Sequence, residues 1–133
     1  MTVFEWDGGL SAFYRKQIVT AACEVAAESC GVDVDDVRAS VRRPNVAFAR
    51  QLAMYLCHTA ANMSLREISD LFGRDRTTVS HACHAIEDRR DCPTFDKQID
   101  FLETEFRAHI RRFMEAAARF GPPVERKGVR RYG

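Results

Sequence analysis

Apolar residues recur at every third or fourth position along most of the chain, which is the spacing of amphipathic helices. The first such stretch predicts a helix from about Leu10 to Ser29, ended by Gly31. Its apolar face is made by Phe13, Ile18, Ala22, Val25 and Ala26. Asp33 can cap a short helix, and a basic loop over residues 42–44 then precedes a helix predicted from about Val46 to Ala60. Strands are not predicted.

The second half of the sequence predicts two short helices and one long helix. Ser64 and Glu67 form an S-x-x-E capping box, which opens a helix that ends at Gly73. The next helix is predicted from about Asp75 to Asp88, and a Cys-Pro break separates it from a long helix from about Phe95 to Phe120. The pattern therefore predicts an all-α fold with a long C-terminal helix.

Length and charge fit a single small domain with two tails. We expect an N-terminal tail over 1–9, a helical domain over 10–120 and a basic, disordered tail over 121–133. The 20 Lys and Arg residues nearly balance the 19 Asp and Glu residues, which gives a net charge of +1. Any binding to nucleic acid must therefore come from a local arrangement of basic residues and not from bulk charge.

The cysteines are odd in number and contain no C-x-x-C pair, so they are interpreted as reduced core residues of a cytoplasmic protein. They are Cys23, Cys30, Cys57, Cys83 and Cys92. No apolar run approaches the roughly 20 residues that a membrane helix needs. We expect no membrane association and a location in the cytoplasm, at the nucleoid.

The segment SLREISDLFGRDRTTVSHACHAI has the pattern of a helix-turn-helix over about residues 64–90. Leu65, Ile68 and Phe72 share the inner face of its first helix, Ser69 is small enough for a close helix crossing, and Gly73 permits a sharp turn. On the second helix, apolar residues at i, i+3, i+4 and i+7 are predicted to face the first helix. They are Val79, Ala82, Cys83 and Ile86.

The opposite face of this second helix is short, polar and rich in hydrogen-bond donors. It contains Arg76, Thr77, Thr78, Ser80, His81 and His84. Such a face fits the major groove of DNA, where hydroxyl, imidazole and guanidinium groups contact base edges or phosphates. Asp75 can cap the helix or accept from a cytosine amino group. The alternative is a polar helix face that only meets water.

Three blocks of sequence resemble the C-terminal DNA-binding domain, domain IV, of the bacterial replication initiator DnaA. RDRTTVSHAC resembles the family signature R-D-H-T-T-V-x-H-A, RQLAMYL resembles R-Q-x-A-M-Y-L, and SLREISDLFG resembles S-L-x-E-I-x-x-x-F-G. A weaker resemblance extends from about Ile18 to Leu102. It implies a Trp-repressor-like helix-turn-helix that binds double-stranded DNA.

The resemblance also implies roles for individual residues. Arg42 takes the place of a basic-loop arginine that enters the minor groove, and Arg50 and Gln51 match residues near the DNA. The residues that match the signature positions for the major groove are Asp75, Thr77, Thr78 and His81. Further phosphate contacts are expected from Arg43 and Arg74.

Several positions depart from the family pattern. Arg76 stands where the family usually has histidine, Phe48 replaces an arginine, and Ala85 replaces a common lysine. These changes put the family's usual DNA site in doubt as the target. The seven glycines form no G-x-x-x-x-G-K-[ST] loop, so we expect no nucleotide cofactor and no ATPase activity.

The sequence allows three alternatives to DNA binding. His81, Cys83 and His84 suggest a zinc site or a thiol and base pair for catalysis, but the thiol is predicted to face inward and both imidazoles outward. We therefore predict no metal site and no enzyme activity. A protein-interaction module, or a homodimer through the long last helix, stays open because its apolar stripe continues past Leu102. That stripe can pack on the first helix, on a twin subunit or on a partner.

Among DNA-binding functions, the sequence alone favours a transcriptional regulator. A free-standing DNA reader without an ATPase can act at promoters simply by occupying its site. The alternative is a regulator of chromosome replication that acts at DnaA-type sites.

Overall fold

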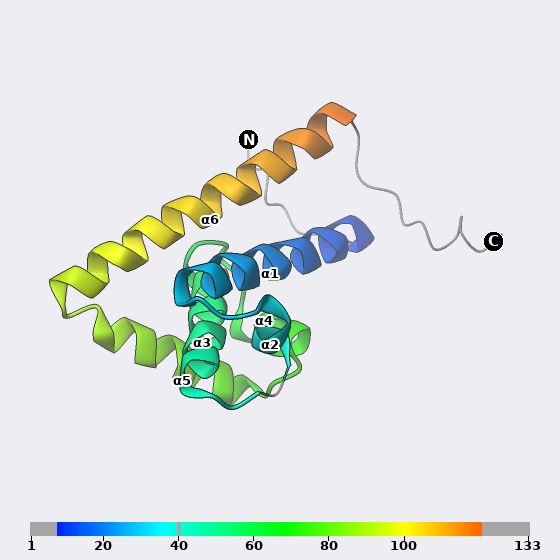
Figure 1. Ribbon diagram of the computed structural model, residues 1–133. Helices are drawn as coiled ribbons and strands as arrows, with labels where there is room; N and C mark the ends of the chain where they lie inside the picture. Colours follow the sequence, from blue (N-terminus) through cyan, green and yellow to red (C-terminus); the bar gives the residue numbers. More distant parts are fainter. Residues whose placement is uncertain (1–7, 40, 121–133) are drawn as a thin grey trace.

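The computed structural model describes residues 8–39 and 41–120, and this part of the chain forms six helices without strands (Figure 1). They are α1 Gly8–Cys30, α2 Val34–Arg38, α3 Pro44–Thr59, α4 Leu65–Phe72, α5 Arg76–Arg89 and α6 Pro93–Phe120. The predicted all-α fold is confirmed. The tail expected over 121–133 lies outside the described residues, and α1 begins at Gly8 and not at Leu10.

The helix ends follow local side-chain chemistry. Asp33 accepts a hydrogen bond from the Asp35 amide at 2.9 Å, which caps α2 as predicted. Ser64 and Glu67 form both bonds of the predicted capping box of α4. One prediction was wrong: Pro44 does not interrupt the pattern as part of the loop but begins α3, because the first helical position needs no N–H donor.

The core lies where α1 crosses α3, with α4 and α5 packed around α3. Its largest fully buried side chains include Ile18, Leu52, Leu56, Ile68, Ile86 and Phe106. Burying an aliphatic or aromatic side chain of this size contributes roughly 1.5 to 3 kcal/mol. The predicted inner faces of α1, α4 and α5 are therefore the faces that make one continuous core.

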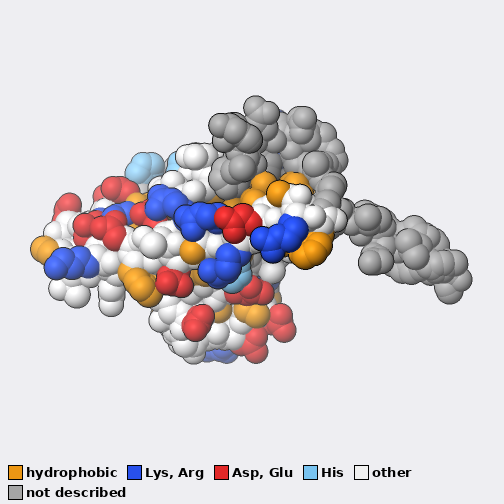
Figure 2. All heavy atoms as spheres, turned by 90° about the horizontal axis from the view of Figure 1, so that it is seen from above, with side chains coloured by type: hydrophobic (Ala, Val, Ile, Leu, Met, Phe, Trp, Pro, Cys, Tyr) orange, Lys and Arg blue, Asp and Glu red, His pale blue; other side chains and the backbone are white. Residues whose placement is uncertain are grey.

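The long helix α6 lies across α1 at the top of the molecule in Figure 1. Phe106 and Ile110 are buried against the core, and the ring of Phe113 lies 6.3 Å from that of Phe13 and 5.3 Å from that of Tyr14. The stripe beyond Leu102 thus packs on the first helix, one of the three partners considered for it. The outer surface of α6, seen from above in Figure 2, mixes basic and acidic side chains.

An ionic cluster fastens the start of α6 to α3 and α5. Arg90 pairs with Asp96, Asp100 and Glu103 of α6, and its side chain is only 17% exposed. The same guanidinium donates to the hydroxyl of Tyr55, which itself donates to Glu87 at 2.6 Å. The cluster was not visible in the sequence, since its members come from three helices.

All five cysteines are free, but they are not all core residues. Cys23, Cys57 and Cys83 are buried, and burial raises the pKa of Cys23 and of Cys83 to about 11. Cys30 is half-buried and Cys92 is exposed, because it lies in the turn before α6, so the core interpretation was wrong for these two. No helix within residues 8–39 and 41–120 is long and apolar enough to cross a bilayer.

Candidate nucleic-acid interface

The predicted helix-turn-helix is formed by α4, a tight turn and α5. Gly73 adopts a left-handed conformation with φ of 68°, which a residue without a side chain reaches at little cost. Ser69 is buried where α4 meets α5, as a close crossing requires. The four predicted inward residues of α5 are all buried. The turn therefore presents the opposite face of α5 to solvent.

The exposed face of α5 contains the residues that the sequence predicted there. Arg76, Thr77, Thr78, His81 and His84 are exposed, whereas Ser80 is half-buried. The ring nitrogen Nδ1 of His84 lies 3.0 Å from the carbonyl oxygen of Ser80, one turn earlier, which ties the ring to its own helix. The side chains of Arg76, Thr77 and His81 have no such tie among the described residues. Their polar groups are open to a ligand.

Asp75 caps the first turn of α5. Its carboxylate accepts a hydrogen bond from the Thr78 amide at 2.9 Å, and this backbone bond, with a side-chain bond from Thr78 and the charge of His81, lowers the pKa of Asp75. An ionised cap at a helix N-terminus also complements the helix dipole. Asp75 is exposed, so it can contact a base in addition to capping.

The basic loop between α2 and α3 presents two exposed arginines. Arg42 and Arg43 are exposed, and Arg43 forms an ion pair with Asp36 at 2.8 Å. Gln51 is half-buried on α3. Figure 1 draws this loop and α5 in the lower part of the molecule, where the end of α5 leads into α6. The structure thus brings the two predicted DNA-facing elements to one side.

Arg50 has a different environment from the other candidate arginines. Its Nε donates to the carbonyl of Val37 at 2.8 Å, and its Nη2 lies within 3.1 Å of the carbonyl oxygens of Asp36, Ala39 and Val41. These acceptors form the end of α2 and the start of the basic loop. The guanidinium is therefore used to hold the loop, and a direct contact of Arg50 with DNA stays a prediction.

Arg74 joins the turn of the helix-turn-helix to the same loop. It is half-buried, and its Nη2 donates to the carbonyl of Ala39 at 2.9 Å. Its Nε is buried without a hydrogen-bond partner among the described residues. Like Arg50, it acts in the structure as a link between segments.

The sequence did not predict the environment of Arg89. The guanidinium of Arg89, at the end of α5, lies 4.7 Å from the ring centroid of Phe48 and 4.5 Å from that of Phe95. The only signal in the sequence was the replacement of a family arginine by Phe48. No spacing rule connects residues this far apart in the chain.

The described residues contain no group of three or more His, Cys, Asp or Glu side chains arranged to hold a metal ion. Cys83 is buried, whereas His81 and His84 are exposed on the other face of α5. The thiol and the imidazoles therefore do not face each other.

Comparison with known proteins agrees with the helix-turn-helix geometry. Residues 19–86 match the family described as the bacterial dnaA protein helix-turn-helix. The chain is 48% identical over 73 residues to the chromosomal replication initiator protein DnaA of Corynebacterium aurimucosum, which covers 53% of this chain and 13% of that protein. It is 37% identical over 81 residues to the DnaA protein of Lachnoclostridium phytofermentans, which covers 59% of this chain and 18% of the relative.

Solved structures show the same similarity. A DNA replication initiation factor superposes with a TM-score of 0.68 at 31% identity, over 74% of this chain and 31% of the other. A replication initiator DnaA bound to AMPPCP and single-stranded DNA gives a TM-score of 0.65 at 32% identity, over 72% and 30%. This chain thus spans less than a third of each of these proteins. They are replication initiators, and they give no support to the transcriptional regulator that the sequence favoured.

Proposed function

Because this chain belongs to the bacterial DnaA helix-turn-helix family, we propose that it binds double-stranded DNA sequence-specifically in a role connected with chromosome replication. The observation that carries the proposal is the exposed polar face of α5, which lies at the same end of the molecule as the exposed arginines of the basic loop. Such binding would take place in the cytoplasm, at the nucleoid.

In the proposed complex, the first turns of α5 enter the major groove. Thr77 and His81 offer a hydroxyl, a methyl and an imidazole to base edges, and these groups are free of bonds to the described residues. Asp75 keeps the helix capped by accepting from the Thr78 amide. Helix-turn-helix proteins read bases with this part of the second helix.

The basic loop supplies the second contact in the proposed complex. Arg42 extends to the minor groove or the backbone, while Arg43 is oriented by its ion pair with Asp36. Contacts of arginine with phosphate release counterions, so each should add about 0.9 to the slope of log K against log salt. Binding should therefore weaken steeply as salt rises.

Selection of preferred duplexes from a random pool tests sequence-specific binding. The full chain should enrich one family of sites, and Thr77→Ala and His81→Ala should each lower affinity for that site by roughly 1 to 3 kcal/mol without loss of the fold. Thr104→Ala is the matched control, because Thr104 is an exposed threonine of α6. Equal affinity for all duplexes would reject a specific reader.

A map of bound sites across a genome tests the replication role. Binding concentrated at the replication origin is expected. Binding concentrated at promoters would instead restore transcriptional regulation as the function.

A further inference from the structure

Arg89 occupies an aromatic notch made by two other helices. Phe48 of α3 and Phe95 of α6 have ring centroids 6.2 Å apart with their planes tilted by 56°, and the Arg89 guanidinium lies over both rings. A cation over aromatic faces within about 6 Å is attracted by the ring quadrupoles. The two rings therefore fix the position of a side chain that would otherwise be mobile at a helix end.

The hydrogen-bonding edge of this guanidinium is unused. Arg89 is exposed, and no described residue forms a hydrogen bond or an ion pair with it. The adjacent Arg90 is the opposite case, since three carboxylates and a hydroxyl surround it. Stacking on the rings uses only the faces of the Arg89 guanidinium. The N–H donors at the edge of the guanidinium form a planar fork that suits a phosphate.

The notch lies beside the start of α3, where the basic loop ends. Phe48 is one turn beyond Pro44, the first residue of the helix, and Arg43 immediately precedes that helix. At 1.5 Å per residue, the opposite end of α5, with Arg76, is roughly 20 Å away. In a helix-turn-helix the first residues of the second helix contact the base edges, so we expect the far end of α5 to lie nearer to the sugar-phosphate backbone.

We propose that Arg89 is a further DNA contact of this protein, which binds a backbone phosphate next to the segment contacted by the basic loop. Phe48 and Phe95 are its positioning residues. The family pattern has an arginine where this chain has Phe48. In this chain the ring of Phe48 orients Arg89, an arginine supplied by α5. This inference rests on the proposed binding to double-stranded DNA.

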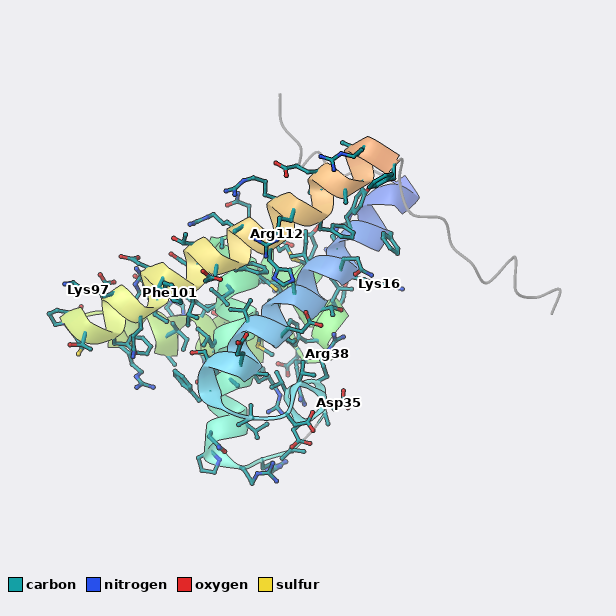
Figure 3. The ribbon with its side chains drawn as sticks, turned by 45° about the horizontal axis from the view of Figure 1, so that its top comes forward. Lys16, Asp35, Arg38, Lys97, Phe101 and Arg112 are labelled. Atoms are coloured by element: carbon teal, nitrogen blue, oxygen red, sulfur yellow. The ribbon has the colours of Figure 1, made fainter. Side chains whose placement is uncertain are left out.

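The test measures affinity of the full chain against salt, on the selected site and on a random duplex. Arg89→Ala should weaken both to the same extent and lower the salt slope by about 0.9, because one phosphate contact is lost. Arg89→Gln should do the same with less loss of packing. Arg112→Ala is the charge-matched control, since Arg112 lies on α6 beside α1 (Figure 3), and it should change neither quantity.

Phe95→Leu separates positioning from charge. It removes one ring and keeps the arginine, so affinity should fall while the salt slope stays unchanged. The proposal is overturned if both Arg89 variants keep the affinity and the salt slope of the unaltered protein, as Arg112→Ala is expected to do. Loss of binding in Thr77→Ala alongside unchanged Arg89 variants would reject the Arg89 contact alone, whereas absence of duplex binding by the unaltered chain would reject the proposed function itself.

Discussion

Arg50 of α3 and Arg74 of the turn before α5 donate to the same backbone oxygen, the carbonyl of Ala39, at 2.7 and 2.9 Å. Burial and the nearby charge of Arg74 both lower the pKa of Arg50. Two cations thus converge on one carbonyl at the start of the basic loop. The arrangement links that loop to the helix-turn-helix and sets the distance between the two surfaces proposed to meet DNA.

Arg50→Lys should therefore weaken DNA binding nearly as much as Arg50→Ala. Lysine keeps the charge, but a single ammonium cannot reproduce the planar set of bonds to Val37, Ala39 and Val41. Each lost hydrogen bond has a net value of about 1 kcal/mol, so the melting temperature should fall as well. Affinity on the selected site and thermal unfolding are the measurements.

Arg42 provides the comparison for Arg50. Arg42→Lys should keep most of the affinity, because Arg42 is exposed and its charge is expected to act directly on DNA. If Arg50→Lys instead bound like the unaltered chain while Arg50→Ala lost about 0.9 of salt slope, Arg50 would be a phosphate contact and not a link.

The contrast between these arginines shows what a sequence can and cannot predict. Periodicity and capping rules placed the inner residues of α5 and the bounds of α4 correctly, because those features depend on neighbours a few residues away. The direction of Arg50 depends on carbonyl groups of a loop that folds back on α3. No local pattern distinguishes such an arginine from Arg42.

The same reasoning applies to α6. Its apolar stripe was visible in the sequence, but the stripe alone could not choose between α1 and another molecule as its partner. The rings of Phe13 and Tyr14 against Phe113 make that choice. The ionic cluster around Arg90 was equally hidden, since Tyr55 reaches it from α3.

Arg90→Ala should destabilise the protein by roughly 1 to 3 kcal/mol, because it removes the hydrogen bond to Tyr55 and leaves the buried carboxylate of Glu103 without its cation. Urea unfolding measures the change. Arg111→Ala, which removes an exposed arginine of α6, is the control and should change stability by less than about 0.5 kcal/mol. Equal effects of the two substitutions would mean that the cluster contributes nothing beyond surface charge.

The cap of α5 predicts a specific dependence of stability on pH. Hydrogen bonds from Thr78 and the charge of His81 hold the pKa of Asp75 below its ordinary value of 3.8. A carboxylate whose pKa is lower in the folded state stabilises the fold above the unfolded pKa, and this stability is lost as pH falls through the folded pKa. The contribution is therefore complete near pH 7 and disappears only in strong acid.

Asp75→Asn isolates that contribution, because asparagine caps a helix comparably but has no charge to lose. The melting temperature of the unaltered chain should exceed that of Asp75→Asn at neutral pH, and the two should converge below pH 3.8. Asp70→Asn, on the exposed side of α4, is the control and should show no such convergence. A constant difference across the whole range would rule out the ionised cap.

On the exposed polar face of α5, Arg76 is the clearest departure from the family signature. It is the first residue of α5, directly after the cap, and its side chain is exposed. No described residue forms an ion pair with it, although Asp70 and Asp75 are close in sequence. A free guanidinium at this position can reach guanine O6 and N7 or a phosphate.

Arg76→His restores the residue that the family usually has and should change the preferred DNA site at one or two adjacent base pairs. The reason is that a forked donor to guanine is worth about 1 to 3 kcal/mol of discrimination, which a single imidazole at the same position would not reproduce. Selection from a random pool with each protein measures the preference, and Arg66→His, an exposed arginine of α4, is the matched control. Uniform weakening on every duplex would identify a phosphate contact instead. If both the preference and the affinity stayed unchanged, Arg76 would have no part in reading DNA, and the difference from the family at this position would be without consequence for the target site.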